Sequence, residues 1–322
     1  MRKMEGVPVE ATLVLRLVTG LFVLMMLYFA SIQIPLVGPL VGTLIPLPII
    51  LVCRRVGWWS GFFLVLVAGG AILYLEHFFQ FPGEIVHFLG LALIGLLLAL
   101  LSQRGYSADR AIGFTVLVVA VIGGSVFIGQ TLARGVSPFE YLTQTIGDLV
   151  KGFLALLGKE GIPPEQLMPD DLTVSGLIQL LVQISPALWL INTTLVVWLN
   201  MILSRAIWRR ATGEETGPPL NLWKTPEWLV FVALGAGFGL LMPMGWISNV
   251  ALNILLLCGL IYFYQGLAIV AFIFHQCQVP KIIRALGYPL LLLKPVTILV
   301  IGVGLVDLWF DFRRLHRPPS QA

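Results

Sequence analysis

Residues 249–275, NVALNILLLCGLIYFYQGLAIVAFIFH, decide the fold of this chain. They can cross a bilayer as one helix, since a membrane span needs about 20 predominantly apolar residues. The segment is nevertheless polar for a span, because Asn249, Asn253 and Tyr264 fall within about 80° of one another at about 100° per residue. Gln265 lies about 100° beyond Tyr264. Lipid cannot satisfy such groups, so we expect this stripe to face other helices or a wet cavity.

The composition supports a membrane location for the whole chain. Hydrophobic residues make up 58% of the 322 positions and charged residues 11%, whereas a soluble protein has about 25% charged residues. The net charge is +4, but Lys and Arg lie in short loops between apolar runs, so no nucleic-acid partner is expected. The three cysteines are scattered and odd in number, which indicates neither a disulfide framework nor a CxxC metal pair.

The apolar runs predict an all-α, polytopic bundle of about nine transmembrane helices with one extracytoplasmic amphipathic insertion. The first run has no A-x-A cleavage signal, so we expect it to be retained as a helix rather than removed as a signal peptide. The chain divides into a five-span region (1–133), the insertion (134–183) and a four-span region (184–322). The expected spans are 17–32, 34–53, 58–75, 85–101, 111–132, 186–205, 228–241, 249–275 and 286–310, of which 186–205 is the membrane part of a longer helix.

The second expected span is rich in proline, with Pro35, Pro39, Pro46 and Pro48 in the run. Proline removes helix hydrogen bonds, so this span is expected to be kinked or partly unwound. Lipid cannot bond the freed carbonyl groups, and the span is therefore expected to be packed inside the bundle.

The insertion contains a segment, residues 138–157, in which apolar residues recur at helical spacing. Polar residues such as Asp148 and Lys151 interrupt it, so an interfacial helix lying on the membrane fits better than a span. Asp170 or Asp171 can cap the helix that follows, which is expected to run to about Trp208.

Positive charges orient the chain. With a cytosolic N-terminus, the basic loops after the second, fourth, sixth and eighth spans all lie in the cytosol, and the insertion lies outside. In a nine-span arrangement the basic tail, Arg313, Arg314 and Arg317, lies outside as an exception. The alternative is that the last segment is re-entrant.

Two polar stripes supply the candidate ligand contacts. The 171–208 helix carries Asn192, Thr193, Asn200 and Ser204 within an arc of about 120°, and the other stripe is the one in residues 249–275. The stripes either line a cavity for a small ligand or bond helices to one another. The candidate contacts are Asn192, Asn200, Asn249, Asn253, Tyr264 and Gln265.

Titratable side chains gather at two places. Glu84 and His87 are three residues apart, a spacing found in carboxylate–histidine metal sites, and Glu76 and His77 lie in the same turn region. The alternative is that these residues lie at two helix ends beside a turn and have no functional role. Asp307 and Asp311 lie near the end of the last span, where an ionisable group is either functional or paired with a nearby arginine.

Enzyme signatures are not found in the sequence. It has no HExxH helix, no GxSxG elbow and no GxxxxGK[ST] phosphate loop. We therefore expect no catalytic activity, no cofactor and no resident metal.

Several segments together resemble the YybS-like family of uncharacterised bacterial polytopic membrane proteins. They are LNMILSRAIWRR (199–210), WKTPEW (223–228), the NxxxNILLLxxLIYFYQGLAI run (249–269) and GLVDLWFDFRR (304–314). The resemblance covers most of the chain, most specifically residues 186–314. It implies a multi-pass protein of the bacterial cytoplasmic membrane and no particular activity.

Residues 35–62, PLVGPLVGTLIPLPIILVCRRVGWWSGF, are weakly similar to small-residue-rich membrane modules. These include the S subunits of energy-coupling-factor vitamin importers and the rod-shape protein MreD. S subunits commonly dock a transporter partner through an AxxxA surface on the first helix. Here Ala11 is followed four residues later by Leu15, so that motif is missing.

The sequence thus favours a transport-like or small-ligand-binding membrane module. The alternative is a non-catalytic membrane scaffold or assembly factor, in which the amides only hold helices together. The expected partners are the lipid bilayer and either another membrane protein or a second copy of the chain.

Overall fold

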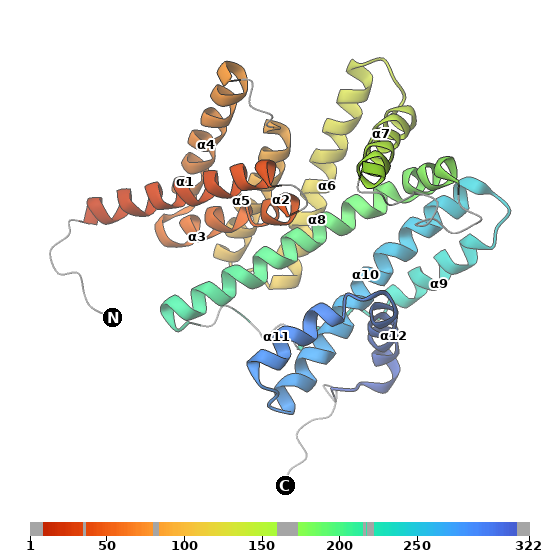
Figure 1. The fold of residues 1–322 in the computed structure, drawn as a ribbon. Helices are drawn as coiled ribbons and strands as arrows, with labels where there is room; N and C mark the ends of the chain where they lie inside the picture. Colours follow the sequence, from red (N-terminus) through yellow and green to blue (C-terminus); the bar gives the residue numbers. More distant parts are fainter. Residues whose placement is uncertain are drawn as a thin grey trace, which may run out of the picture. The chain divides into compact units, whose positions relative to one another are not determined.

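The structure is a computed structural model that describes residues 9–34, 37–79, 84–159, 173–214, 217 and 222–313. Every regular element in these residues is a helix, which confirms the all-α prediction (Figure 1). The helices are α1 (Val9–Gln33), α2 (Gly38–Gly42), α3 (Pro46–Val56), α4 (Trp58–Phe79), α5 (Ile85–Gln103), α6 (Ala108–Ala133), α7 (Pro138–Lys159), α8 (Val174–Thr212), α9 (Leu229–Leu240), α10 (Gly245–Gln276), α11 (Lys281–Leu290) and α12 (Lys294–Phe310).

The chain forms two compact units, each described by itself below. Unit 1 comprises Met1–Gly124 and Asn192–Gly217, and unit 2 comprises Ser125–Ile191 and Pro218–Ala322. Two of the three boundaries between the units fall inside helices α6 and α8, and the third follows Gly217.

Seven of the nine expected spans are long, apolar helical segments able to cross a membrane by length and composition: α1, α2 with α3, α4, α5, α6, α8 and α10. The expected span at 228–241 is the 12-residue α9, which is about 18 Å long and shorter than the hydrocarbon core of about 30 Å. The polytopic prediction is confirmed, whereas the described helices give seven spans, or eight if the last bent pair of helices counts as one.

The last expected span is not one continuous helix. Helices α11 and α12 meet at an angle of 100°. Pro295 is the second residue of α12, and the preceding Leu291–Leu293 amides bond three residues back, which tightens the chain into a turn. Thr297 Oγ1 donates to Leu291 O at 2.9 Å and satisfies a carbonyl at this break. A proline and a local cap therefore divide the 286–310 run.

The proline-rich second span is interrupted between α2 and α3, in agreement with the predicted kink or partial unwinding, and most of α3 is buried. Helix α2 ends at Gly42 and α3 begins at Pro46, with Ile45, Ile49 and Cys53 fully buried. In unit 1, α3 packs against α1, α4 and α5. Gly61 of α4 allows this approach, since a Cβ there would overlap Cys53 Sγ.

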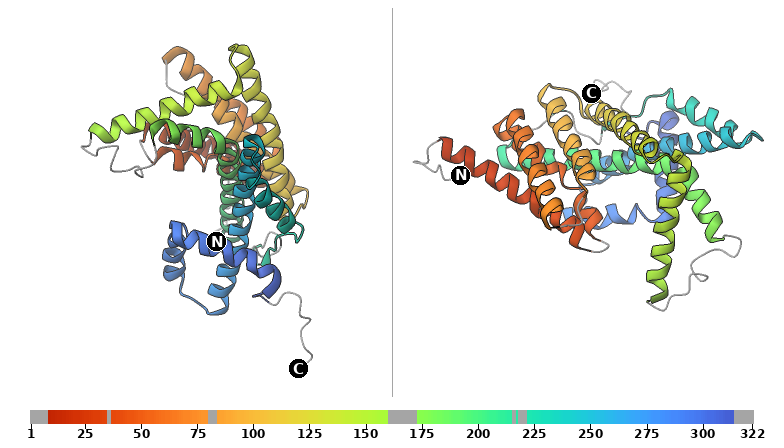
Figure 2. Two further views of the ribbon diagram at one scale, coloured as in Figure 1. Left: turned by 90° about the vertical axis from the view of Figure 1, so that its right-hand side faces the viewer. Right: turned by 90° about the horizontal axis from the view of Figure 1, so that it is seen from above.

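Helix α10 is the centre of unit 2 and packs against α9 and α12. The views in Figures 1 and 2 agree that α9 and α10 run side by side. Leu229, Cys258 and Tyr262 form a buried apolar cluster there, against which Ile301 and Leu305 of α12 pack. The stretch that decides the fold is thus the helix around which the C-terminal region assembles.

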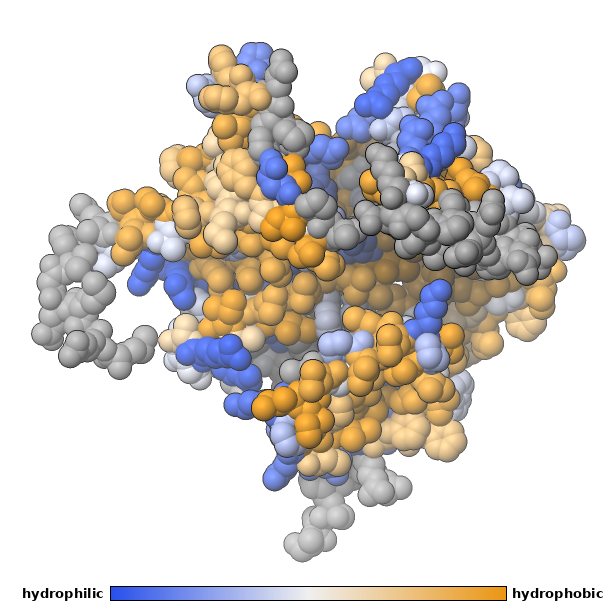
Figure 3. Space-filling view, viewed as in Figure 1, coloured by the Kyte–Doolittle hydropathy of each residue, from blue (hydrophilic) through white to orange (hydrophobic). Residues whose placement is uncertain are grey.

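Apolar side chains cover much of the described surface on the face shown in Figure 3. Phe231, Leu241 and Ile282 are among the large hydrophobic residues that stay exposed. Exposed apolar surface on this scale requires lipid rather than water around it.

The predicted amphipathic segment 138–157 is helix α7. Leu149, Phe153 and Leu156 are exposed along it. Helix α8 is capped by Thr173, whose Oγ1 accepts the Gly176 N–H at 3.1 Å. Asp170 and Asp171, the caps considered from sequence, lie outside the described residues.

Candidate functional site

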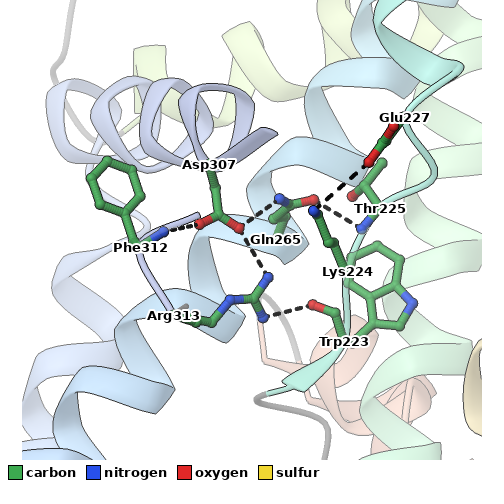
Figure 4. Close-up of polar contacts among 8 residues, drawn as sticks. All are labelled: Trp223, Lys224, Thr225, Glu227, Gln265, Asp307, Phe312 and Arg313. Atoms are coloured by element: carbon green, nitrogen blue, oxygen red, sulfur yellow. Dashed lines mark hydrogen bonds and ion pairs between the residues drawn. The ribbon is translucent and has the colours of Figure 1, made fainter. Parts of the chain in front are cut away.

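Asp307 of α12 and Gln265 of α10 form the centre of a buried polar cluster in unit 2. Both side chains are fully buried. Gln265 Nε2 donates to Asp307 Oδ2 at 2.9 Å, and Gln265 Oε1 accepts the Thr225 N–H at 2.9 Å (Figure 4). One side-chain amide therefore joins two helices to the extended segment that precedes α9.

Arg313 neutralises Asp307 and completes the cluster. Its Nη2 lies 3.0 Å from Asp307 Oδ2, and both side chains of this ion pair are 0% exposed. Its Nη1 donates to Trp223 O at 2.8 Å, and the Phe312 N–H donates to Asp307 Oδ1 at 2.9 Å. Both carboxylate oxygens are thus bonded, which is what makes a buried ion pair tolerable.

The left-handed backbone of Asp311 brings Arg313 back onto Asp307. Asp311 has φ 42 and ψ 60 and caps α12, with its N–H donating to Asp307 O. The chain reverses there, so that residues five and six positions after Asp307 bond its carboxylate. Asp307 and Asp311 therefore have different roles: one is the buried anion and the other shapes the turn.

Two glycines let α10 and α12 approach closely enough for this cluster. A Cβ at Gly266 would overlap Val300 O, and a Cβ at Gly304 would overlap Tyr262 O. The backbones are therefore in direct contact beside Gln265. Gly266 and Gly304 allow the two helices to approach each other. Gln265 and Asp307, which lie beside these glycines in the YQG and GLVD parts of the sequence, form a hydrogen bond between the helices.

Asn253 of α10 bonds the backbone of α8 where Pro186 interrupts that helix. Asn253 Oδ1 accepts the Ala187 N–H at 2.8 Å, and Nδ2 donates to Gln183 O at 2.8 Å. Proline at 186 has no N–H and crowds the carbonyls of the preceding turn. Ser185 Oγ donates to Val182 O at 2.8 Å, the carbonyl that residue 186 would normally bond. Polar side chains thus satisfy the interrupted turn.

In unit 1, Asn200 bonds a backbone carbonyl group at the break between α2 and α3. The Leu47 N–H donates to Leu44 O rather than to its helical partner, Thr43 O. Asn200 Nδ2 donates to Thr43 O at 2.7 Å and to Val196 O at 2.8 Å. Since both neighbours are carbonyl oxygens, the orientation of the amide is fixed, with Nδ2 as the donor. Each unit thus uses an asparagine, the fully buried Asn200 and the half-buried Asn253, to satisfy backbone groups of a helix that proline interrupts.

The other candidate contacts are placed differently. Asn192 is exposed on α8, Asn249 is half-buried and its backbone oxygen accepts a bond from Asn253 Nδ2, and Tyr264 is buried. Asn192 and Asn200 belong to unit 1, and the contacts on α10 belong to unit 2.

The turn-region cluster is only partly brought together. Glu76 and Glu84 are close enough to Tyr28 to act on it electrostatically, and Tyr28 Oη accepts the Glu84 N–H at 3.2 Å. His87 is exposed, and His77 is exposed beside the Phe78 ring. Across the described ranges, no three His, Cys, Asp or Glu side chains are grouped as a metal ion needs.

Sequence reasoning missed the partners of these residues. Thr225 and Trp223 contribute backbone groups, which no side-chain pattern reveals. Pro186 was a usable signal, since a proline inside a long span predicts freed backbone groups that a neighbouring polar residue must satisfy.

The comparisons with known proteins agree with this architecture. A family model described as predicted membrane protein (DUF2232) matches residues 21–308, most of the chain, and this is consistent with the YybS-like resemblance. Neither a curated protein nor a solved structure matches the chain. With its apolar helices and a match over nearly its full length, the chain belongs to the DUF2232 family of predicted membrane proteins.

Proposed function

We propose that this protein is a non-catalytic scaffold or assembly factor of the bacterial cytoplasmic membrane. The observation that carries the proposal is the bonding of Asn253, whose three hydrogen bonds all go to backbone groups of α8 and α10. An amide used in this way has little capacity left for a ligand, because its two donors and its acceptor are engaged. Such a residue holds helices together.

The state of Asp307 supports a non-catalytic role. A general acid or base must exchange a proton with a substrate. Asp307 is fully buried, paired with Arg313 and bonded at both oxygens. A carboxylate held like this stabilises an arrangement of helices.

The proposed orientation places the N-terminus in the cytosol. It rests on the basic loops between the spans, which orient membrane proteins toward the cytosolic side. The proposed partners are the bilayer and either another membrane protein or a second copy of the chain, as a scaffold requires.

One observation favours the second candidate, a transport-like or small-ligand-binding module. In the part of the chain that the structure describes, the buried atoms Asn200 Oδ1 and Thr225 Oγ1 have no hydrogen-bond partner. A buried acceptor without a partner is costly, and a small polar ligand that donates a hydrogen bond would relieve that cost.

Uptake by the purified chain separates the two candidates. The full chain is reconstituted alone into proteoliposomes and tested against a panel of labelled amino acids, vitamins, sugars and inorganic ions. The scaffold proposal predicts no uptake above empty vesicles and no solute-dependent change in melting temperature. Saturable uptake that Asn200→Leu abolishes would contradict it and support the second candidate.

A further inference from the structure

Helix α11 of unit 2 has an apolar side that the described part of the chain leaves uncovered. At about 100° per residue, four large aliphatic side chains of this helix fall within an arc of about 100°. They are Ile282, Ile283, Leu286 and Leu290, here called the α11 stripe. Each of the four residues is between 56% and 75% exposed. Exposed apolar side chains grouped in this way require lipid or another protein beside them.

A different side of α11 contacts α10. A Cβ added at Gly287 would lie 3.2 Å from Phe274 Cζ, and the centres of the Tyr288 and Phe274 rings are 5.7 Å apart, edge to face. Arg284 Nε donates to Val279 O at 2.7 Å, in the turn that precedes the helix. These contacts hold α11 against the rest of unit 2 while the α11 stripe stays exposed.

The basic residues of α11 lie opposite the stripe. Lys281 and Arg284 fall within about 60° of each other, on the far side of the helix from the aliphatic side chains. Residues 228–306 contain no Asp or Glu, and the ion pairs of the described residues include neither of these two cations. A helix with one apolar side and an uncompensated basic side is typical of binding to an anionic membrane surface.

The length of α11 fits a position near the lipid head groups. Ten residues make a helix of about 15 Å, half the thickness of the hydrocarbon core of about 30 Å. Helix α12 continues at an angle of 100° to it. The long side chains of Lys281 and Arg284 can reach phosphate groups while their aliphatic parts cover apolar surface.

We propose that α11 is a binding surface for anionic phospholipid, with the α11 stripe among the acyl chains and Lys281 and Arg284 at the phosphate groups. A second copy of the chain would also cover the stripe, but it would bring the same positive charges near one another. Anionic lipid supplies the opposite charge. The surface does not depend on the scaffold proposal, because a transport-like module would contact the bilayer in the same way.

The test measures which lipid lies beside the stripe in the full chain. Leu286→Cys is combined with Cys277→Ser, so that the remaining native cysteines are Cys53 and Cys258, which are both buried. A fluorophore is attached to residue 286, and the labelled chain is placed in nanodiscs of mixed phosphatidylglycerol and phosphatidylcholine. In one sample the phosphatidylglycerol carries a quenching spin label on its acyl chain, and in the other the phosphatidylcholine carries it.

Two double variants of this labelled chain are compared. Lys281→Gln with Arg284→Gln removes both charges of α11. The matched control is Arg55→Gln with Arg110→Gln, which removes two exposed charges from unit 1. If the α11 double variant does not fold, Lys281→Gln alone decides, because Lys281 is exposed and Arg284 keeps its bond to Val279 O.

We expect both lipids to quench the fluorophore in the labelled chain with its native charges, with phosphatidylglycerol preferred at least about fivefold, the effect of one basic residue near an anionic surface. The preference should disappear in the α11 double variant, fall at least about twofold in Lys281→Gln and persist in the control. Equal quenching by the two lipids, a preference that the α11 variants keep, or an equal loss in the control would each overturn the proposal. Quenching by neither lipid would also overturn it, since another protein or a second copy would then cover the stripe.

Discussion

Asn253 bonds the turn of α8 that Pro186 interrupts: its amide accepts the Ala187 N–H and donates to Gln183 O, each at 2.8 Å. Those two backbone groups are the donor and acceptor of one helical turn. A polar side chain in the first third of α10 thereby makes a proline inside α8 tolerable. The same relation exists in unit 1 between Asn200 and the break that precedes Pro46.

Replacing Asn253 with leucine should destabilise the protein moderately without preventing insertion. Polar contacts between membrane helices contribute about 0.6 kcal/mol on average and at most about 1.7 kcal/mol, so losing the two bonds to α8 should cost about 1–3 kcal/mol. The measurement is the free energy of unfolding in mixed detergent micelles, followed by circular dichroism.

Asn249→Leu is the matched control for this prediction. Asn249 lies one turn earlier on α10, and its backbone oxygen, not its amide, takes part in the Asn253 bonding. Asn249→Leu should lower the free energy of unfolding much less than Asn253→Leu does. Equal losses from both substitutions would show that the effect is general to polar residues on α10.

Breaking the Asp307–Arg313 pair should be more damaging. Arg313→Gln leaves a fully buried carboxylate without its cation, and removing one partner of a buried pair costs about 3–5 kcal/mol. We expect a large fall in melting temperature or loss of the folded protein during purification. The double substitution Asp307→Leu with Arg313→Met should recover part of the loss, because no unpaired charge remains.

The neighbouring pair Lys224–Glu227 serves as the control. Its atoms lie 4.0 Å apart and the Glu227 side chain is 77% exposed. Glu227→Gln should change the melting temperature little, since exposed ion pairs contribute about 0–1 kcal/mol. A comparable loss from Glu227→Gln and Arg313→Gln would contradict a buried role for Arg313.

Alanine at Gly266 should separate α10 from α12. Its Cβ would overlap the Val300 carbonyl, which cannot move without shifting the helix. The expected cost is about 1–3 kcal/mol, as for other overpacked sites. Gly259 lies on the same helix with nothing within 4 Å of an added Cβ, so Gly259→Ala should be neutral or slightly stabilising by helix propensity. Similar melting temperatures for the two variants would argue against the close backbone contact.

The proposed orientation predicts which cysteines react from outside the cell. In a version without the three native cysteines, Gln144→Cys on α7 should react with an impermeant thiol reagent in intact cells. Arg210→Cys at the end of α8 should react only after the membrane is opened. Both side chains are exposed in their own units, so access depends on the membrane side. The reverse labelling pattern would invert the whole topology.

Much of the architecture was predictable because apolar length and proline placement act locally. The runs that became α1, α4, α5, α6 and α10 are long and apolar enough to be recognised without tertiary information. The kink in the second span follows from Pro46 and Pro48, which cannot donate helix bonds. Each of these features depends only on neighbouring residues.

The last span and the polar contacts were harder to predict because they depend on residues distant in sequence. The bend between α11 and α12 needs the Thr297 cap as well as Pro295. The sequence indicated that Asn253 must find a partner, but not that the partner is a turn 66 positions away. The pairing of Asp307 with Arg313 requires the left-handed turn at Asp311, which a non-glycine residue rarely adopts.

The central claim is that asparagine amides satisfy proline-interrupted helices, and a double-mutant cycle tests it most directly. Free energies of unfolding are measured for the native chain, Pro186→Ala, Asn253→Leu and the double variant. Alanine at 186 removes the ring that crowds the carbonyls of the preceding turn, so that the Ala187 N–H and Gln183 O can bond each other. Asn253→Leu should therefore cost at least about 1 kcal/mol less in that background. If the losses of the two single variants add up to the loss of the double variant within about 0.3–0.5 kcal/mol, the two sites are independent, and that result would contradict the account.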